Sequence, residues 1–156
     1  AGNLARQALA RCEAARLTFE RRLPLGDLGA AASATGEVEL ARRWLLESLA
    51  IARQIADRTQ EISCLGHLGW LYLRLKQAAE ASESLQMALA LAERIDSRTE
   101  QSWLRAGLAE AHRLDGHLDL AAEQAHQALK LALANGRPYD QALAWRILAE
   151  LGQADL

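Results

Sequence analysis

The sequence repeats itself with a period of about 40 residues, and this periodicity constrains the fold more than any other feature. The segment Ile55–Gln60 returns as Ile95–Glu100, with Ile, Arg and Thr kept in place. Further positions recur in columns one period apart: Leu28, Leu68 and Leu108; Ala41, Ala81 and Ala121; Leu49, Leu89 and Leu129; Ala52, Ala92 and Ala132. Such a period is typical of units that stack on their neighbours, because one unit cannot bury its apolar face alone.

Each unit is predicted to contain two helices separated by a short break. In the middle unit, apolar residues recur at steps of three and four from about residue 60 to 75, which is the spacing of one helical face. A break is expected near Lys76, followed by a second helix from about residue 78 to 95. The pair Asp96–Ser97 is expected to end that helix and to cap the next one. In the third unit, Gly116 is expected to supply the positive φ of a tight helix end.

The composition favours an all-α fold. Ala and Leu dominate, Val38 is the only valine, and Pro24 and Pro138 are the only prolines. A chain short of β-branched residues and rich in helix-forming residues is predicted to be helical almost throughout. The path of the chain around Pro24 stays open, because this proline could start a shortened helix or kink a longer one.

Charge and residue types exclude several classes of function. With 51% hydrophobic residues and a formal net charge of −2, the chain is neither disordered nor a strongly basic nucleic-acid binder. No apolar run approaches the roughly 18 residues of a membrane helix. Cys12 and Cys64 have no metal-ligand spacing, and a reducing, cytoplasmic location is expected. Since no phosphate loop or nucleophile motif is present, we expect neither an enzyme nor a cofactor.

The repeated unit resembles the tetratricopeptide repeat (TPR). Leu68-Gly69-x-x-Tyr72, followed by Ala81, Leu85 and Ala88, is similar to the pattern of that family. The resemblance implies a right-handed α-solenoid of antiparallel helix pairs. The period is longer than the usual one, as in the long variety that is typical of bacterial multidomain signalling and transcriptional regulators.

The register of the resemblance divides the chain into complete and partial repeats, about eight helices in all. A single solenoid segment over residues 1–156 is expected, with a half-repeat at 1–21, repeats at about 22–60, 61–100 and 101–138, and a half-repeat at 139–156. Because neither end reads as a polar cap, we expect the parent protein to continue on both sides.

The resemblance also implies where a partner binds, because the first helix of each pair lines a concave groove in this family. The predicted partner-binding residues are Ala30, Trp70, Arg74, Trp103, Glu110 and Arg113. Trp and Arg are enriched at binding hot spots, and a small residue such as Ala30 would leave room for a ligand side chain. The alternative is that Trp70 and Trp103 only fill gaps between adjacent first helices.

Other residues have a structural and a functional interpretation. Leu4 and Trp44 share a column on the second helices and could form a small apolar patch for self-association. Trp145 shares the column of Leu25 and Leu65, so packing is favoured for it. Packing is also favoured for Cys64 over a reactive thiol. No metal site is predicted, because packing of His112 in the tyrosine column is favoured over a surface metal site at the turn that carries His112, Asp115, His117 and Asp119.

The leading hypothesis is a protein–protein interaction module that binds a peptide or a helix in the groove, as part of a larger regulatory protein. One alternative is a sensor of a small ligand or signal peptide in a bacterial transcriptional regulator. A second alternative is a scaffold that forms homo-oligomers through the ends of the solenoid. We expect neither a nucleic acid nor a membrane as partner.

Overall fold

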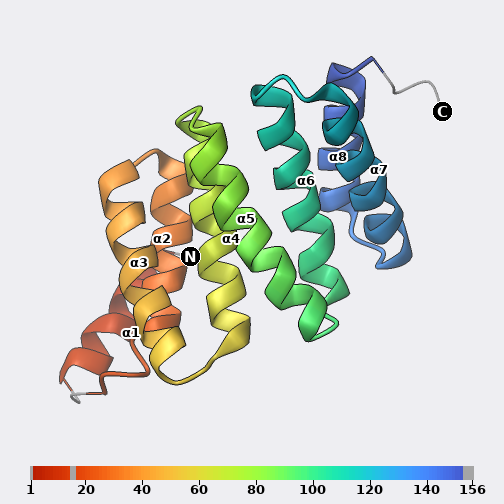
Figure 1. Ribbon diagram of the computed structural model, residues 1–156. Helices are drawn as coiled ribbons and strands as arrows, with labels where there is room; N and C mark the ends of the chain where they lie inside the picture. The colour runs from red at the N-terminus through yellow and green to blue at the C-terminus, as the bar shows by residue number, and fades with distance from the viewer. Residues whose placement is uncertain (1, 15–16, 153–156) are drawn as a thin grey trace. The chain divides into compact units, whose positions relative to one another are not determined.

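The computed structural model describes residues 2–14 and 17–152, which form eight α-helices (Figure 1). The helices are α1 (Gly2–Ala14), α2 (Arg22–Thr35), α3 (Val38–Gln54), α4 (Arg58–Arg74), α5 (Ala78–Arg94), α6 (Arg98–Leu114), α7 (Leu118–Ala134) and α8 (Pro138–Glu150). They pack in sequential antiparallel pairs, as expected for a TPR-like array, so the predicted all-α fold is confirmed. The expected outer limits at residues 1 and 156 lie outside the described residues.

The chain divides into two compact units, an N-terminal unit of residues 1–71 and a C-terminal unit of residues 72–156. Within the N-terminal unit, α2 packs against both α1 and α3. Within the C-terminal unit, α6 packs against α5, α7 and α8. The contact between α6 and α8 joins the first helices of two successive pairs, which is the packing expected of stacked repeats.

The turns between helices follow one geometric rule. A residue with positive φ, between 50° and 87°, stands at every twentieth position from residue 36 to residue 136. These residues are Gly36, Ala56, Lys76, Asp96, Gly116 and Gly136. After each one, the next backbone N–H donates to a carbonyl five residues back, as Asp57 does to Ala52 at 2.8 Å and His117 to His112 at 2.9 Å. This is the Schellman arrangement, which satisfies carbonyls that the helix end would otherwise leave unpaired.

The turn spacing explains the period of the sequence. Each of the helices α3 to α7 has 17 residues. Three turn residues complete each helix to 20, and two helices make the period of about 40 residues. The helix α2 has only 14 residues, with Pro24 in its first turn, where a missing N–H removes no intrahelical bond. Pro24 therefore belongs to the first turn of a shortened helix and does not kink a longer one.

The prediction that the Ser97 side chain caps the following helix is wrong. Ser97 is the N-cap of α6, but its side chain makes no capping hydrogen bond. The backbone of the turn takes over part of this role, because the N–H of Arg98 donates to the carbonyl of Asp96 at 3.0 Å. In contrast, the carboxylate of Asp57 accepts the N–H of Gln60 at 3.1 Å and caps α4.

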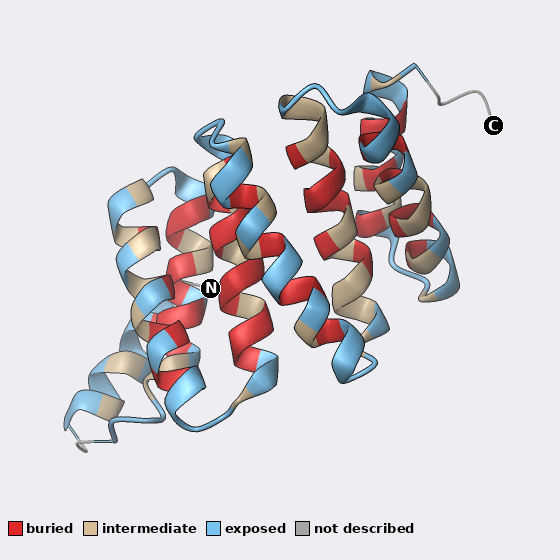
Figure 2. Ribbon diagram, in the orientation of Figure 1, coloured by how far each residue is buried: buried red, intermediate tan, exposed pale blue. Residues whose placement is uncertain are grey.

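Small residues in the recurring columns allow close helix packing. Ala41, Ala81 and Ala121 are fully buried, and buried residues gather on the inner faces of the helices (Figure 2). At Gly29 a Cβ atom would lie 2.5 Å from Leu45 Cγ, so only glycine permits this approach of α2 to α3. Among the described helices, none is both long enough and apolar enough to cross a membrane.

The turn geometry predicts that glycine stabilises the chain at position 56, in the turn after α3, and destabilises it at position 50, within α3. Ala56→Gly should stabilise the chain by about 1 kcal/mol, because an L-residue with a Cβ is strained at a φ of 57°. Gly136→Ala should cost a similar amount at a φ of 61°. Urea unfolding followed by circular dichroism measures both changes. Ala50→Gly, at an exposed position within α3, is the matched control and should destabilise. If Ala56→Gly destabilised as Ala50→Gly does, the assigned turn geometry would be wrong.

Candidate protein-binding surface

One of the predicted binding residues lines an open cavity in the N-terminal unit. Ala30 lies on α2 beside a cavity of about 690 Å³, which we call the α1–α2 cavity. Its walls come from both helices: Leu4, Ala5, Ala8 and Cys12 on α1, Leu23, Pro24, Asp27, Ala30 and Ala31 on α2, and Glu20 before α2. The resemblance pointed to the side of α2 but missed the contribution of α1. The sequence columns mark the apolar faces of α1 and α2, but they do not show that a cavity opens between these two helices.

The α1–α2 cavity combines apolar walls with negative charge. Leu4 and Leu23 are exposed, and Glu20 and Asp27 are the acidic residues among the lining groups. Burial lowers the pKa of His67 on α4, and the carboxylate of Asp27 opposes this shift only in part. His67 is therefore neutral at pH 7 and does not offset the negative charge of Asp27. The cavity is suited to an apolar group that carries a positive charge at its edge.

Trp70 and Arg74 lie one turn apart on α4. Trp70 is half-buried, and Arg74 is exposed. Residues four apart share one face of a helix, so both side chains belong to the same face of α4. Their role in binding, like that of the half-buried Trp103 on α6, stays a prediction.

Glu110 and Arg113, predicted to face a partner, bind each other on α6. Arg113 donates to Glu110 from Nε at 2.9 Å and from Nη2 at 2.6 Å. This bidentate hydrogen bonding raises the pKa of Arg113 further above its ordinary value. The carboxylate of Glu150 on α8 lies 3.4 Å from the same Nε atom, a contact that the sequence analysis missed. The charge of Arg113 is thus largely balanced within the chain.

The two residues predicted for self-association do not line the same cavity. Leu4 is 73% exposed and lines the α1–α2 cavity. Trp44 is half-buried with Val38 and Leu40 against a core cluster of Ala32, Ala41 and Leu71. It also lines a smaller cavity of about 220 Å³, which Leu4 does not line. The apolar patch of Leu4 and Trp44 therefore stays a prediction, with much of the tryptophan already used in packing.

Trp145 differs from its expected packing. It is 37% exposed, whereas Leu25 and Leu65 in the same column are 1% and 4% exposed. In a complete pair, the second helix covers this column, as α3 covers α2. Within the described residues no helix follows α8, so the indole is left partly uncovered.

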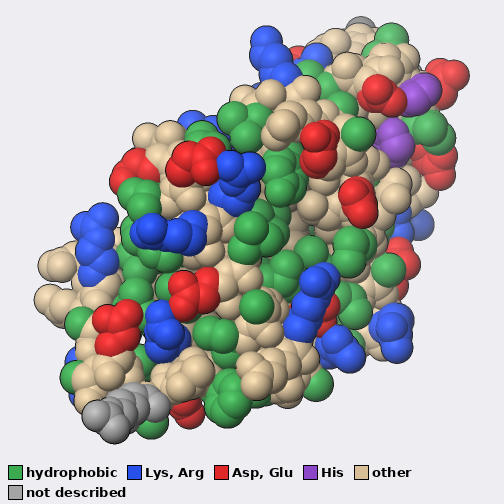
Figure 3. All heavy atoms as spheres, turned by 60° about the vertical axis from the view of Figure 1, so that its left-hand side comes forward, with side chains coloured by type: hydrophobic (Ala, Val, Ile, Leu, Met, Phe, Trp, Pro, Cys, Tyr) green, Lys and Arg blue, Asp and Glu red, His purple; other side chains and the backbone are tan. Residues whose placement is uncertain are grey.

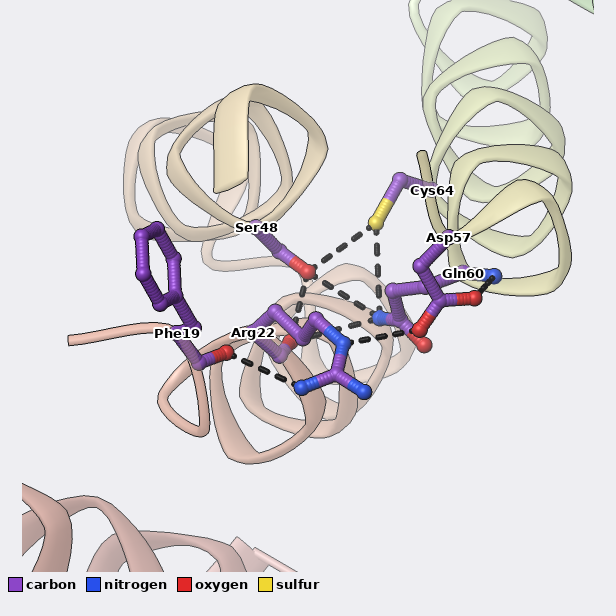
Figure 4. Close-up of polar contacts among 6 residues, drawn as sticks. All are labelled: Phe19, Arg22, Ser48, Asp57, Gln60 and Cys64. Carbon is purple, nitrogen blue, oxygen red and sulfur yellow. Dashed lines mark hydrogen bonds and ion pairs between the residues drawn. The ribbon is translucent and has the colours of Figure 1, made fainter. Parts of the chain in front are cut away.

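A buried polar cluster, which the sequence analysis missed, joins α2, α3 and α4 (Figure 4). The hydroxyl of Ser48 donates to the carbonyl of Arg22 at 2.6 Å and accepts from Gln60 Nε2 at 3.0 Å. The thiol of Cys64 lies 3.1 Å from the same hydroxyl. We call Arg22, Ser48, Gln60 and Cys64 the polar cluster. Each position holds a different residue in the other repeats, so no column pointed to it.

Cys64 has the structural role that the sequence favoured. Its side chain is fully buried, and burial raises the pKa of the thiol. Reactive cysteines need an accessible thiolate, which this environment disfavours. The interpretation of Cys64 as a packed side chain is therefore confirmed.

The ionic contact of Arg22 extends the polar cluster toward the surface. Arg22 Nε donates to Asp57 Oδ2 at 2.7 Å, and Arg22 also donates to the carbonyl of Phe19 at 3.0 Å (Figure 4). The hydrogen bond from Arg22 and the N–H of Gln60 lower the pKa of Asp57. The cluster thus links the start of α2 to the turn between α3 and α4.

The turn that carries His112, Asp115 and His117 is held together by contacts among its own side chains. His117 Nδ1 lies 3.0 Å from Asp115 Oδ2, and the rings of His112 and His117 meet edge to face with centroids 6.3 Å apart. Burial and the neighbouring His117 lower the pKa of His112, which occupies the tyrosine column of the repeat. In the part of the chain that the structure describes, no three His, Cys, Asp or Glu side chains are grouped to hold a metal ion.

Charges of both signs are spread over the molecular surface. On the face in Figure 3, Lys and Arg side chains alternate with Asp and Glu among hydrophobic ones. Charged side chains of the described residues form several ion pairs, for example Arg105 with Glu93 at 2.7 Å and Arg42 with Glu39 at 2.6 Å. This face has no broad positive field of the kind that would attract nucleic acid.

Comparison with known families supports the resemblance over about half of the chain. Residues 20–94, which include α2 to α5, match the tetratricopeptide repeat. These residues therefore form a TPR segment, a type of domain that generally mediates protein–protein interaction and is typically non-catalytic. A comparison with curated proteins found no match.

The polar cluster predicts a large effect of a small substitution. Ser48→Ala should destabilise the chain by about 1–3 kcal/mol, because Gln60 and the carbonyl of Arg22 lose a buried partner. Chemical denaturation measures the change. Ser82→Ala is the control, since Ser82 forms its hydrogen bond with Gln86 at the surface, and it should change stability by less than about 0.5 kcal/mol. Equal effects of the two variants would contradict the role given to the cluster.

The Arg22–Asp57 pair predicts a pH dependence. The pKa of Asp57 is lowered below 3.8 in the folded chain, so the pair stabilises it above that pH. The contribution is lost as the pH falls through the lowered pKa. Arg22→Gln should therefore reduce the free energy of unfolding at pH 7, and this difference from the wild type should shrink as the pH falls below 3.8, as measured by urea titrations. The exposed Arg43→Gln is the control. A difference for Arg22→Gln that does not change with pH would contradict the pairing.

Proposed function

We propose that this chain is a protein–protein interaction module that binds an extended peptide or a helix along the first helices of its repeats. The observation that carries the proposal is the open α1–α2 cavity, which contains the predicted Ala30 and the exposed Leu23 on the first helix α2. An apolar side chain of a partner can enter such a cavity and be desolvated there. The TPR match over residues 20–94 supports the same class of function.

The remaining predicted residues have distinct roles in this proposal. Trp70 and Trp103 supply aromatic contact area, and Arg74 supplies a positive charge one helical turn from Trp70. Glu110 and Arg113 form an ion pair, and a charged partner that binds one of them must break this pair and lose its free energy. The aromatic residues and Arg74 should therefore contribute more to affinity than the Glu110–Arg113 pair.

A sensor of a small ligand is the second candidate function. The α1–α2 cavity, at about 690 Å³, lies within the range of roughly 300–1,000 Å³ that is usual for small-molecule sites. Its apolar walls and two carboxylates would suit an amphiphilic cation. Native mass spectrometry of the purified chain distinguishes the two candidates, since a sensor retains additional small-molecule mass.

The wider context of the proposal rests on the repeat length. Repeats of about 40 residues resemble those of bacterial multidomain signalling and transcriptional regulators. We assign the module to a larger cytoplasmic regulator of this kind, with a protein or peptide as partner.

The experiment selects binding peptides from a random displayed library on the immobilised chain and measures their affinities. The double variant Trp70→Ala, Arg74→Ala should weaken the selected peptides at least about tenfold, because it removes an aromatic and a cationic contact. Circular dichroism checks that helicity is kept. Leu133→Ala, an exposed apolar residue on the second helix α7, is the control and should leave affinity unchanged. Equal affinities of wild type and double variant would reject the binding face.

A further inference from the structure

A second cavity opens in the C-terminal unit, between α5 and the turn that joins α6 to α7. It has a volume of about 360 Å³, and we call it the α5–α7 cavity. Its walls come from three helices and one turn: Ala78, Ala79, Ser82, Glu83 and Gln86 on α5, Ala111 and His112 on α6, Asp115 and His117 in the turn, and Leu120 on α7. None of the residues proposed above for partner binding is among these described lining residues, so the cavity is a separate feature.

Short side chains on α5 open this cavity. One period earlier, on α3, the columns of Ala79 and Ser82 hold Glu39 and Arg42, which form an ion pair at 2.6 Å. Long charged side chains of this kind can cover much of the surface of a helix. Because Ala79 and Ser82 are too short to do so, the surface of α5 stays open where that of α3 is covered. The α5–α7 cavity is therefore a local departure from the repeat.

The charge of the cavity wall departs from the repeat as well. Glu83 stands in the column of Arg43, so an acidic residue replaces a basic one. Glu83 is exposed, and it forms no ion pair with another described residue. Asp115 adds a second carboxylate, and no Lys or Arg belongs to the described lining residues. Such a wall is complementary to a positively charged group.

The two histidines of the cavity do not balance the charge of Glu83. Burial and the neighbouring His117 lower the pKa of His112, and Asp115 opposes this shift only in part, so His112 is neutral at pH 7. His117 Nδ1 lies 3.0 Å from Asp115 Oδ2. This contact engages the carboxylate of Asp115, and the negative charge of Glu83 remains.

Apolar groups beside the carboxylates make the cavity suitable for one long basic side chain. Alanines line much of it, and Leu120 at its edge is 46% exposed. The methylene stem of a basic residue packs on such groups while its charged end reaches a carboxylate. A volume of about 360 Å³ lies at the lower end of the roughly 300–1,000 Å³ that is usual for sites of whole small molecules. A single side chain is therefore an occupant of fitting size.

The polar groups of the cavity favour arginine over lysine. Gln86 Nε2 donates to Ser82 Oγ at 3.1 Å, so the carbonyl oxygen of Gln86 is an acceptor in addition to the carboxylates. A guanidinium group has five N–H donors in a fixed plane, whereas an ammonium group has three. It is also more weakly hydrated, so it enters a partly apolar cavity more readily.

We propose that the α5–α7 cavity binds an arginine side chain of a protein partner. The stem of the arginine packs on Ala79 and Leu120, and its guanidinium group donates to Glu83. The exposed Leu120 gives an apolar residue next to the arginine a place to pack, which favours a protein segment over a free cation. This second interaction surface lies mainly on the second helices α5 and α7, and it goes beyond the function proposed for the first helices.

Proton–nitrogen correlation NMR of the full chain tests the proposal with the end-blocked peptide Ala-Leu-Arg-Leu-Ala. The backbone signals of Ser82, Glu83 and His117 should shift as the peptide is added, and the affinity is measured from these signals. The same peptide with the uncharged citrulline in place of arginine should bind at least about tenfold more weakly, and so should end-blocked arginine alone. Unshifted signals, or equal binding of either comparison ligand, overturn the proposal.

Charge reversal within one column supplies a matched pair of variants. Glu83→Arg should weaken the arginine peptide at least about tenfold, because it places like charges together. Glu123→Arg is the control, since Glu123 is exposed one period later on α7 and does not line the cavity, and it should leave affinity unchanged. Arginine is a good helix former, so circular dichroism should show the wild-type helicity for both. Equal weakening by the two variants would contradict the site.

Filling the cavity separates this site from the binding face of the first helices. The double variant Ala79→Glu, Ser82→Arg introduces the pair of long side chains found on α3 and should weaken the arginine peptide at least about tenfold. Peptides that depend on Trp70 and Arg74 should keep their affinity for this variant. Conversely, Trp70→Ala with Arg74→Ala should leave the arginine peptide unaffected. An arginine peptide that binds the filled variant as it binds the wild type overturns the proposed site, whatever the result for the first helices.

Discussion

The left-handed residue that ends each of the helices α2 to α7 is the constraint on which the rest of the structure depends. It stands at every twentieth position from residue 36 to residue 136, and it returns the chain antiparallel through a Schellman turn. Because the turns are equally spaced, the helices α3 to α7 have equal length, and residues one period apart occupy equivalent places in the packing. The buried alanine columns and the close approach at Gly29 follow from this spacing. Three of the six residues are not glycine, so the regular packing is maintained against local backbone strain.

Much of the fold could be predicted because it depends on periodic patterns. The helix pairs, the break near Lys76 and the turn at Gly116 follow from apolar spacing and from glycine, both visible in the sequence. The positive φ of Ala56 and Lys76 could not be predicted in the same way, since neither residue type favours it. The missing side-chain cap at Ser97 could not be predicted from the residue type either, because a backbone hydrogen bond from Arg98 to Asp96 forms in this turn instead.

The candidate site was less predictable than the fold, since it depends on contacts between helices. Positions one sequence period apart show which helix face a residue occupies, but they do not show whether a charged residue forms an ion pair with a neighbour. Glu110 and Arg113 were assigned to a partner, yet they form a bidentate pair, and Glu150 joins them from α8. The polar cluster was missed because each of its positions breaks its column, as Ser48 does where Ala88 and Ala128 follow. Conversely, Trp145 was expected to be buried because Leu25 and Leu65 in the same column are buried, but its side chain is 37% exposed.

The polar cluster also distinguishes otherwise interchangeable repeats. Gln60, Glu100 and Asp140 occupy one column, but each finds its own surroundings: Gln60 binds Ser48, whereas Asp140 accepts the hydroxyl of Ser102 at 2.6 Å. Exchanging two repeats would therefore bury amides and carboxylates without their partners, at a cost of several kcal/mol. The repeats share one architecture, but the buried polar atoms fix their order.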